Sequence, residues 1–188
     1  MSKVAIDMSM SLDGFIAGPN DTPEEGLGKG GEKLHEWLSD PETVEKVSGD
    51  LAKTTGAVIM GRRTYDNSIK WWGDQGPVGD VPCFVLTKKG TEPESFSKVF
   101  TFVTDGIESA LELAKKAAGG KDIGITSAHT IQEYLKAGLV DEINIHLIPI
   151  LLGGGRSLFG ELGKFIELEK ISVKDGSGVT HLTYEVKK

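Results

Sequence analysis

Short apolar segments that alternate with helical spacing restrict the fold of this chain more than any other feature of its sequence. The clearest segment, residues 57–60 (AVIM), contains no polar side chain. A strand without a polar face is buried on both sides, so the sheet that contains it must be covered by helices. Comparable segments follow at 83–87, 123–126 and 143–150, with helical spacing between them. The sequence therefore predicts a parallel sheet with helices on both faces.

The bounds of the expected elements follow from the same spacing. Strands are predicted over 4–10, 57–60, 83–87, 99–103, 123–126 and 143–150. Helical spacing covers 34–51, 107–118 and 131–135. The expected helix starts are Asp40 followed by Pro41, Thr104 or Asp105, and Ser127. Gly138 is expected to end the last of these helices.

The end of the chain has a different pattern. Two alternating segments, 165–173 and 179–186, flank a glycine-rich turn at 175–178 and predict an antiparallel hairpin. No internal repeat or change of composition marks a second domain. The expected fold is thus a single three-layer α/β/α domain over residues 1–188, with a mainly parallel central sheet and an antiparallel C-terminal hairpin.

Composition excludes several classes of partner. The chain carries 21 Lys and Arg against 28 Asp and Glu, a formal net charge of −7, and no basic stripe. Nucleic acid is therefore not an expected partner. The most apolar stretch, 143–152, is too short to span a bilayer, and no secretory signal opens the chain. The expected location is the cytoplasm.

Metal and thiol chemistry are not expected either. The four histidines, His35, His129, His146 and His181, are scattered without the spacing of metal ligands. The only cysteine, Cys83, lies in an apolar segment and is interpreted as a small buried hydrophobic residue.

The segment 26–31 (GLGKGG) fits the glycine pattern of a dinucleotide-binding loop. That motif requires a preceding buried strand, because the glycines let a strand–helix turn approach a pyrophosphate. Here the preceding residues are DTPEE, which do not form a strand pattern. The segment is interpreted as a surface loop, with a mobile lid as the alternative.

Two junctions between a buried strand and a helix are candidates for binding phosphate. Backbone N–H groups at a helix start carry partial positive charge, and a guanidinium group adds bidentate binding. The first junction, 61–64, is Gly61, Arg62, Arg63 and Thr64. The second junction, 126–130, is Thr126, Ser127, Ala128, His129 and Thr130. The alternatives are solvated arginines in salt bridges for the first and an ordinary N-cap for the second.

Three further features remain open from the residues alone. Asp13 follows the first strand, where it either meets a ligand or forms an Asx turn before Gly14. Asn144 and His146 form the polar side of a strand, with a ligand-facing role as the alternative. The glycines 153–155 indicate close approach of the backbone to a ligand or to another strand.

Four segments together resemble the dihydrofolate-reductase-like family, in particular the reductase domain of riboflavin biosynthesis and its stand-alone bacterial relatives. They are 11–18 (SLDGFIAG), 60–64 (MGRRT), 84–87 (FVLT) and 137–159 (AGLVDEINIHLIPILLGGGRSLF). The resemblance covers nearly the whole chain in the expected order. It implies a dihydrofolate-reductase-like fold and a homodimer.

The resemblance also implies NADPH as cofactor. The family's phosphate-binding segment corresponds to Gly61, Arg62, Arg63 and Thr64. The segment beside the adenosine ribose corresponds to Leu86 and Thr87. The border of the nicotinamide and substrate cleft corresponds to Leu12, Asp13 and Ala17. The turn that approaches the diphosphate corresponds to Thr126, Ser127, Ala128, His129 and Thr130.

Two departures from the family accompany the match. Relatives usually carry Gly-Gly where this chain has Thr126 and Ser127, so two side chains stand where cofactor and backbone touch. The acid with which dihydrofolate reductases hold the pteridine has no secure equivalent. Asp13 is the first candidate for it, followed by Glu36 and Asp50.

The resulting hypothesis is an NADPH-dependent reductase that transfers hydride to a C=N or C=O bond of a pteridine or pyrimidine, as in 5-amino-6-(5-phosphoribosylamino)uracil reductase. Asp13 is the predicted catalytic residue. Leu12, Asp13 and Trp37 are the predicted contacts to this small heterocyclic substrate. The alternatives are an inactive nucleotide-binding or dimerisation module of the same fold and a true dihydrofolate reductase.

Overall fold

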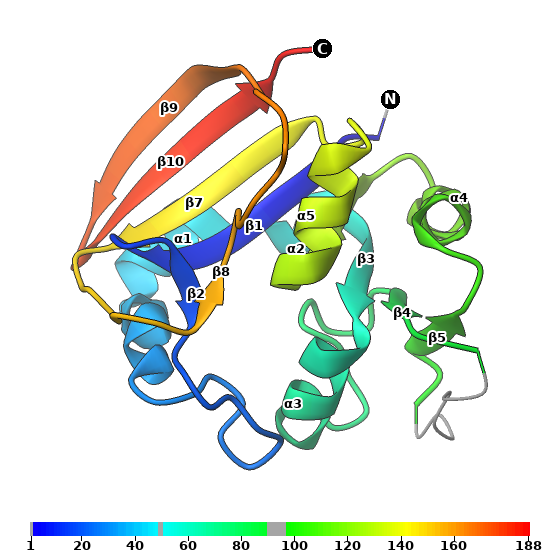
Figure 1. Cartoon of the computed structure of the whole chain (residues 1–188), viewed down its shortest axis with the longest axis horizontal. Helices are drawn as coiled ribbons and strands as arrows, with labels where there is room; N and C mark the ends of the chain where they lie inside the picture. The colour runs from blue at the N-terminus through cyan, green and yellow to red at the C-terminus, as the bar shows by residue number, and fades with distance from the viewer. Residues whose placement is uncertain (1, 49–50, 90–96) are drawn as a thin grey trace.

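A twisted eight-stranded sheet runs through the centre of the molecule (Figure 1). The computed structural model describes residues 2–48, 51–89 and 97–188. The strand order is β5-β4-β3-β6-β1-β7-β10-β9. Their bounds are β1 Val4–Ser11, β3 Thr55–Gly61, β4 Cys83–Leu86, β5 Phe100–Val103, β6 Asp122–Ile125, β7 Glu142–Ile148, β9 Leu168–Gly176 and β10 Val179–Val186. A separate two-stranded sheet pairs β2 (Phe15–Ala17) with β8 (Arg156–Ser157).

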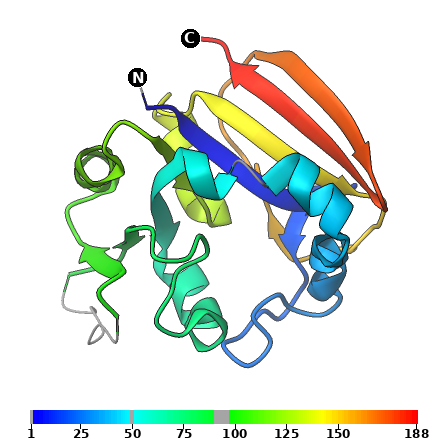
Figure 2. The same cartoon turned by 180° about the vertical axis from the view of Figure 1, so that it is seen from behind.

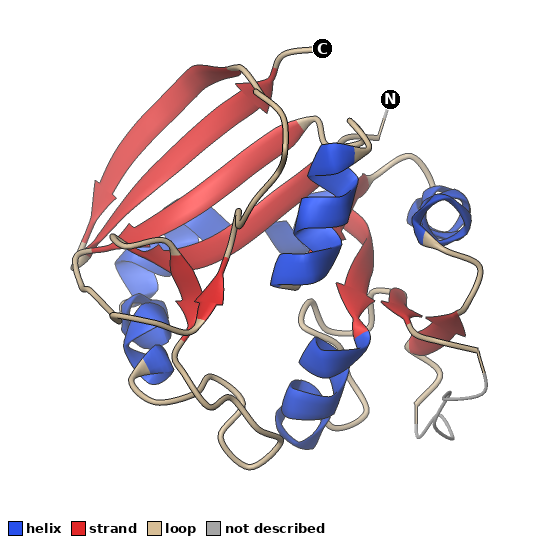
Figure 3. Ribbon diagram, in the orientation of Figure 1, coloured by secondary structure: helices blue, strands red, loops and turns tan. Residues whose placement is uncertain are grey.

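The sheet is parallel from β5 to β7 and antiparallel at its C-terminal edge. Strand β1 pairs in parallel with both β6 and β7, whereas β10 runs antiparallel to β7 and to β9. The predicted mainly parallel sheet with a C-terminal hairpin is therefore confirmed. In Figure 3 the hairpin forms one edge of the continuous sheet.

Helices cover both faces because the central strands are apolar on both sides. Along β3, Ala57 and Ile59 pack in one cluster with α4 (Ile107–Ala118) and α5 (Ala128–Lys136). The alternate residues Val58 and Met60 pack in a second cluster with α3 (Arg62–Trp72). The second face is completed by η1 (Gly31–Ser39), α1 (Pro41–Ser48) and α2 (Leu51–Thr54), which lie in front in Figure 2.

Several boundaries differ from the expected ones. The helical spacing over 34–51 is divided into the 3₁₀ helix η1 and α1, with Pro41 as the first residue of α1 as predicted. Gly106, and neither Thr104 nor Asp105, is the N-cap of α4. The turn of the hairpin is shorter than expected, since Val179 pairs with Gly176 and β9 consequently occupies 168–176 instead of 165–173.

In the part of the chain that the structure describes, no helix combines the length and the apolar character needed to cross a bilayer. Cys83 is buried, and burial raises the pKa of its thiol to about 12, in keeping with a structural role.

Candidate functional site

A cleft of about 1220 Å³ opens where parallel strands of the sheet end. Strands β3, β4 and β6 finish side by side at Gly61, Leu86 and Ile125. Ligands bind outside the carboxyl ends of strands in open α/β sheets, because the loops that follow the strands converge there. The cleft continues from these strand ends to the polar face of β1 and β7, reaching Asp7 and His146.

The first predicted phosphate junction lies in the wall of the cleft. Gly61 ends β3, and the helix α3 starts at Arg62, so Arg62, Arg63 and Thr64 occupy its first turn. The N–H groups of a first helical turn have no partner inside the helix. A Cβ on Gly61 would lie 3.0 Å from the Thr130 hydroxyl oxygen, so the two junctions are in close contact.

Ser127 fastens the second junction to the first. Its φ of 82° is a conformation that side chains rarely adopt, which fits the glycine that the resemblance implies at this position. The Ser127 hydroxyl accepts a hydrogen bond from the Gly61 N–H at 2.9 Å and donates one to the Thr64 hydroxyl at 2.6 Å. Ser127 occupies the N-cap position as predicted, but its side chain does not cap α5. The first hydrogen bond of α5 joins Ile131 N–H to Ser127 C=O at 2.9 Å, which leaves the N–H groups of the first turn available to an anion.

The two arginines of the first junction have different surroundings. Arg62 forms an ion pair with Asp66 at 2.7 Å and reaches the Thr87 hydroxyl at 3.5 Å, at the end of β4. Arg63 is directed at Asp21, 3.2 Å away. The expected alternative, arginines in salt bridges, is therefore present together with a position in the cleft wall. Leu86 and Thr87, predicted beside the adenosine ribose, also line the cleft.

The segment between β2 and η1 is fastened across one end of the cleft by a buried carboxylate. The side chain of Asp21 is only 7% exposed, and it accepts hydrogen bonds from Asn67 at 3.0 Å and from Arg156 at 3.0 Å, besides Arg63. The GLGKGG segment follows Asp21, does not follow a strand, and ends in η1. It is a loop, as interpreted from the sequence, and Gly26 and Leu27 line the cavity.

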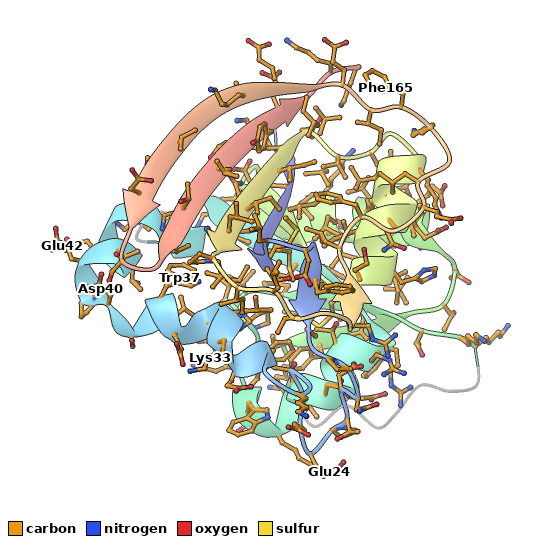
Figure 4. All side chains as sticks on the ribbon, turned by 60° about the vertical axis from the view of Figure 1, so that its left-hand side comes forward. Glu24, Lys33, Trp37, Asp40, Glu42 and Phe165 are labelled. Atoms are coloured by element: carbon orange, nitrogen blue, oxygen red, sulfur yellow. The ribbon has the colours of Figure 1, made fainter. Side chains whose placement is uncertain are left out.

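At the far end of the cleft, Trp37 packs against two histidines. Trp37 lies between η1 and the sheet (Figure 4) and is 6% exposed. Its ring centroid is 4.7 Å from that of His146 and 5.1 Å from that of His181, and its indole N–H donates to the Ser9 hydroxyl at 3.0 Å. His146 in turn contacts Asp7. Trp37, which the sequence predicts as a substrate contact, thus lines the cleft, with its ring held by the protein.

Asp13 and Leu12 are not among the residues that line this cleft. The Asp13 carboxylate accepts hydrogen bonds from the Ser11 hydroxyl at 2.6 Å and from the N–H groups of Leu152 and Gly153 at 3.1 and 2.7 Å. These donors, Ser11 first, hold its pKa below the ordinary value. In this position Asp13 joins the turn after β1 to the glycine-rich segment 153–155.

The other expectations have clear positions. Glu36, the second acid candidate, pairs with Lys33 at 2.7 Å on the surface of η1, and Asp50 lies outside the described residues. The glycines 153–155 were expected to allow close approach of the backbone to a ligand or to another strand, and Gly155 shows such an approach. A Cβ there would lie 2.0 Å from the carbonyl oxygen of Ala17, so this glycine permits close approach of two strands. Ala17 itself lines the cleft.

Sequence reasoning missed Asp7 and Ser9 and gave little weight to His146. Asp7 and Ser9 alternate with apolar residues along β1, and Asn144 and His146 do so along β7. Ser9 pairs with His146 and Asp7 with Asn144 in the β1–β7 register, so the polar sides coincide. The alternation was a usable signal, but the pairing of β1 with β7 was not visible in the sequence.

Within residues 2–48, 51–89 and 97–188, no group of three His, Cys, Asp or Glu side chains is arranged to hold a metal ion. The cleft instead presents N–H groups, hydroxyls and guanidinium groups at one end and a carboxylate with imidazoles at the other. This donor set fits a phosphorylated organic cofactor with a polar substrate beside it.

Known proteins share this architecture over the whole chain. A putatively assigned riboflavin biosynthesis protein from Shewanella sp. PV-4 is 30% identical, with a TM-score of 0.77 and complete coverage of both chains. The dihydrofolate reductase of Enterococcus faecalis, solved with NADP(H), has the same fold at a TM-score of 0.65 and 15% identity, covering 99% of this chain and 97% of its own. The uncharacterized protein YwjB of Bacillus subtilis (strain 168) is 28% identical over 184 residues, 97% of each chain. The family model of the RibD C-terminal domain matches residues 2–182, so this chain belongs to the RibD C-terminal (reductase) domain family and has a dihydrofolate-reductase-like fold.

Proposed function

We propose that this protein is an NADPH-dependent reductase that transfers hydride to a C=N or C=O bond of a pyrimidine- or pteridine-type heterocycle. The observation that carries the proposal is that one cleft joins the helix starts at Arg62 and Ala128 to a polar pocket at Asp7 and His146. Members of the family are NADPH-dependent reductases, and the family model matches residues 2–182 of this chain. The compound 5-amino-6-(5-phosphoribosylamino)uracil, the substrate named for a Thermotoga maritima reductase of the same fold, is the first one to test.

The cofactor end of the cleft would be formed by the two strand–helix junctions. The first turn of α5, residues 128–130, offers N–H groups to a diphosphate. Arg62, which contacts Thr87 just after β4, would bind a 2′-phosphate with its guanidinium group. When bound, NADPH supplies the hydride and its two electrons. The protein's contribution is to hold it in one orientation and to exclude water.

The substrate end would be the polar pocket on the face of β1 and β7, beside the ends of β3, β4 and β6. Trp37 and Ile16 supply apolar surface there, and Asp7, Ser9 and His146 supply polar groups. A flat heterocycle combines an apolar ring face with N–H and C=O groups along its edge, which suits this mixed lining. The ring of Trp37 is packed on both histidines, so it forms a fixed wall of the pocket.

The proposal is tested by two measurements on the purified protein. Titration of NADPH, followed by its fluorescence, measures binding, and the decrease of absorbance at 340 nm with 5-amino-6-(5-phosphoribosylamino)uracil measures turnover. We expect binding of NADPH and turnover that depends on the substrate. Binding without turnover of this substrate or of dihydrofolate would favour the alternative of an inactive nucleotide-binding module. An absence of NADPH binding would contradict the proposal.

A further inference from the structure

Three titratable side chains form a continuous chain from the cleft into the core. Asp7 lines the cleft on β1, with its side chain 28% exposed. Its Oδ1 atom is 2.9 Å from Nε2 of His146 on β7. Nδ1 of His146 is 2.7 Å from Nδ1 of His181 on β10, and the two histidines are direct partners in the β7–β10 register. Both histidines are 5% exposed.

The rings of this chain are held in place by their neighbours. Trp37 packs on both imidazoles, and the two imidazole centroids are 4.8 Å apart at an angle of 72°. The indole N–H of Trp37 is itself fixed on Ser9, the residue that pairs with His146 across the sheet. Rotation of either histidine would break these contacts, so His146 presents the same nitrogen to Asp7.

The chemistry of the contacts determines where the protons lie. An ionised carboxylate only accepts hydrogen bonds, so the proton between Asp7 and His146 belongs to Nε2 of His146. Nδ1 of a neutral His146 then accepts, and Nδ1 of His181 donates to it. This arrangement leaves Nε2 of His181 as a bare acceptor. Among the described residues, that atom is buried without a hydrogen-bond partner.

The surroundings keep His181 neutral and so maintain this pattern. Burial, followed by the neighbouring His146, lowers the pKa of His181 to about 4, and Lys174 acts in the same direction. Asp7 opposes the shift. Lys174 faces His181 from β9, and His35 faces the pair from η1, with its own pKa lowered by burial. His181 is therefore uncharged at neutral pH, and Asp7 is the acidic group at the cleft end of the pair.

We propose that Asp7 is the proton-donating residue of the reduction, and that His146 and His181 are positioning residues that hold its carboxyl group toward the substrate. This inference rests on the proposed reductase function. Oδ1 of Asp7 is hydrogen-bonded to His146, whereas no residue in the described part of the chain is hydrogen-bonded to Oδ2. Oδ2 can therefore carry a proton without any change of tautomer in the two histidines.

The proton balance of the step is simple. The substrate carbon receives a hydride and its two electrons from the reduced nicotinamide, and the C=N or C=O double bond becomes a single bond. The nitrogen or oxygen of that bond takes the proton of Asp7 Oδ2, so an O–H bond of Asp7 breaks and an N–H or O–H bond of the product forms. Asp7 remains as a carboxylate that accepts from His146 Nε2–H and regains a proton from water.

Asp13 is less suited to this step than Asp7. Its carboxylate receives three hydrogen bonds from the protein, and these donors stabilise the ionised form. It also lies outside the residues that line the cleft. Asp7 has one hydrogen-bond partner and a side chain in the cleft wall.

The first test compares variants in turnover of 5-amino-6-(5-phosphoribosylamino)uracil and in NADPH binding. We expect Asp7→Asn to lower kcat about 100-fold, since general acid catalysis contributes about 10²- to 10⁴-fold, while the Kd for NADPH changes less than about twofold. Asp7→Glu should restore part of the rate. The control Asp105→Asn, at an exposed carboxylate before α4, should behave as wild type. Near-normal kcat in Asp7→Asn would overturn the inference.

The pH profile separates a proton role from a merely structural one. If a carboxyl group donates the proton, kcat of the wild type should rise as pH falls, and this rise should be absent in Asp7→Asn. His146→Gln should shift the profile while Asp7 is still present. An unchanged profile in both variants would overturn the inference. If the wild type binds NADPH but reduces neither this substrate nor dihydrofolate, the proposed function fails, and the proton role fails with it.

A readout independent of turnover is the tautomer of each histidine. Two-bond ¹H–¹⁵N NMR spectra of the wild type at neutral pH should show His146 protonated at Nε2 and His181 protonated at Nδ1. In Asp7→Asn the same spectra report whether the pair remains ordered, which tests folding at the site directly. Averaged tautomers in the wild type, or the opposite tautomers, would overturn the positioning role of the histidines.

Discussion

The Ser127 hydroxyl donates a 2.6 Å hydrogen bond to the Thr64 hydroxyl, and it thereby joins the two helix starts that face the proposed cofactor. The same oxygen accepts from the Gly61 N–H at 2.9 Å. A backbone donor that would otherwise face an anion is thus used inside the protein. The Gly-Gly pair that the resemblance implies for relatives would leave this donor to the phosphate. Ser127 therefore occupies the Gly61 N–H, which a phosphate could otherwise accept from, and at the same time links the two junctions directly.

Two substitutions of Ser127 separate the hydrogen bonds from the backbone strain. Ser127→Ala removes both hydrogen bonds and keeps the φ of 82°, so we expect it to lower the free energy of unfolding by about 1–2 kcal/mol. Ser127→Gly removes the same hydrogen bonds but relieves the strain, which is worth about 1 kcal/mol or more. Urea denaturation should find the glycine variant more stable than the alanine variant. The reverse order would contradict this account.

The same glycine variant should bind the cofactor more tightly. In Ser127→Gly the Gly61 N–H is released from its protein partner and can donate to a phosphate oxygen. We expect the Kd for NADPH to fall about threefold or more, in line with one added hydrogen bond of about 1 kcal/mol. Fluorescence titration measures the effect, and a weaker or unchanged affinity would show that the phosphates do not approach this junction.

Arg62 should discriminate between NADPH and NADH. Hydrogen bonds to charged groups contribute about 1.5–3 kcal/mol, so Arg62→Met should raise the Kd for NADPH about tenfold or more. The Kd for NADH, which lacks the 2′-phosphate, should change by less than about twofold. Arg63→Met is the matched control, because Arg63 is paired with the buried Asp21 and should affect NADPH much less. If Arg62→Met changed the Kd values for NADPH and NADH equally, Arg62 would not be the residue that binds the 2′-phosphate.

Asp21 should control the closure of the loop that precedes η1. Its carboxylate, 7% exposed, is shared by Arg63, Arg156 and Asn67. Asp21→Asn removes the charge that holds both arginines, and we expect a loss of about 1–2 kcal/mol in stability, a reduced value for partly exposed partners. Limited proteolysis should cleave the variant faster within residues 18–30. Asp66→Asn, which breaks the half-buried pair with Arg62, is the control and should leave this cleavage unchanged.

Local pattern was sufficient to predict most of the fold. The apolar segments at 57–60 and 83–87 correspond to β3 and β4, and the terminal alternation gave the hairpin. Errors arose where local signals conflict. The N-cap of α4 is Gly106, whereas Thr104 or Asp105 was predicted. Because the hairpin turn has only two residues, 177–178, β9 ends closer to the C-terminus than predicted. Such details depend on tertiary packing, which propensity does not contain.

The cleft was predictable from the sequence at its strand–helix junctions and not at its polar end. Strand–helix junctions are local, so 61–64 and 126–130 could be identified from glycines, arginines and hydroxyls in sequence, and both line the cleft. Asp7, His146 and His181 come from three separate strands. Their contact depends on the order β1-β7-β10 and its register, which no local spacing contains.

Acid should destabilise the protein between about pH 6.5 and pH 4, because of His181. Burial lowers its pKa from 6.5 in the unfolded chain to about 4 in the folded one, so between these values the unfolded state binds more protons. The contribution of His181 to the free energy of unfolding is therefore fully present above pH 6.5. It decreases as pH falls toward 4, by roughly 3 kcal/mol for a shift of this size. His35, whose pKa burial also lowers, adds to the same trend. Urea denaturation at pH 7.5 and pH 4.5 should show a clearly smaller difference in His181→Gln than in the wild type, and an equal difference would assign the acid sensitivity to other groups.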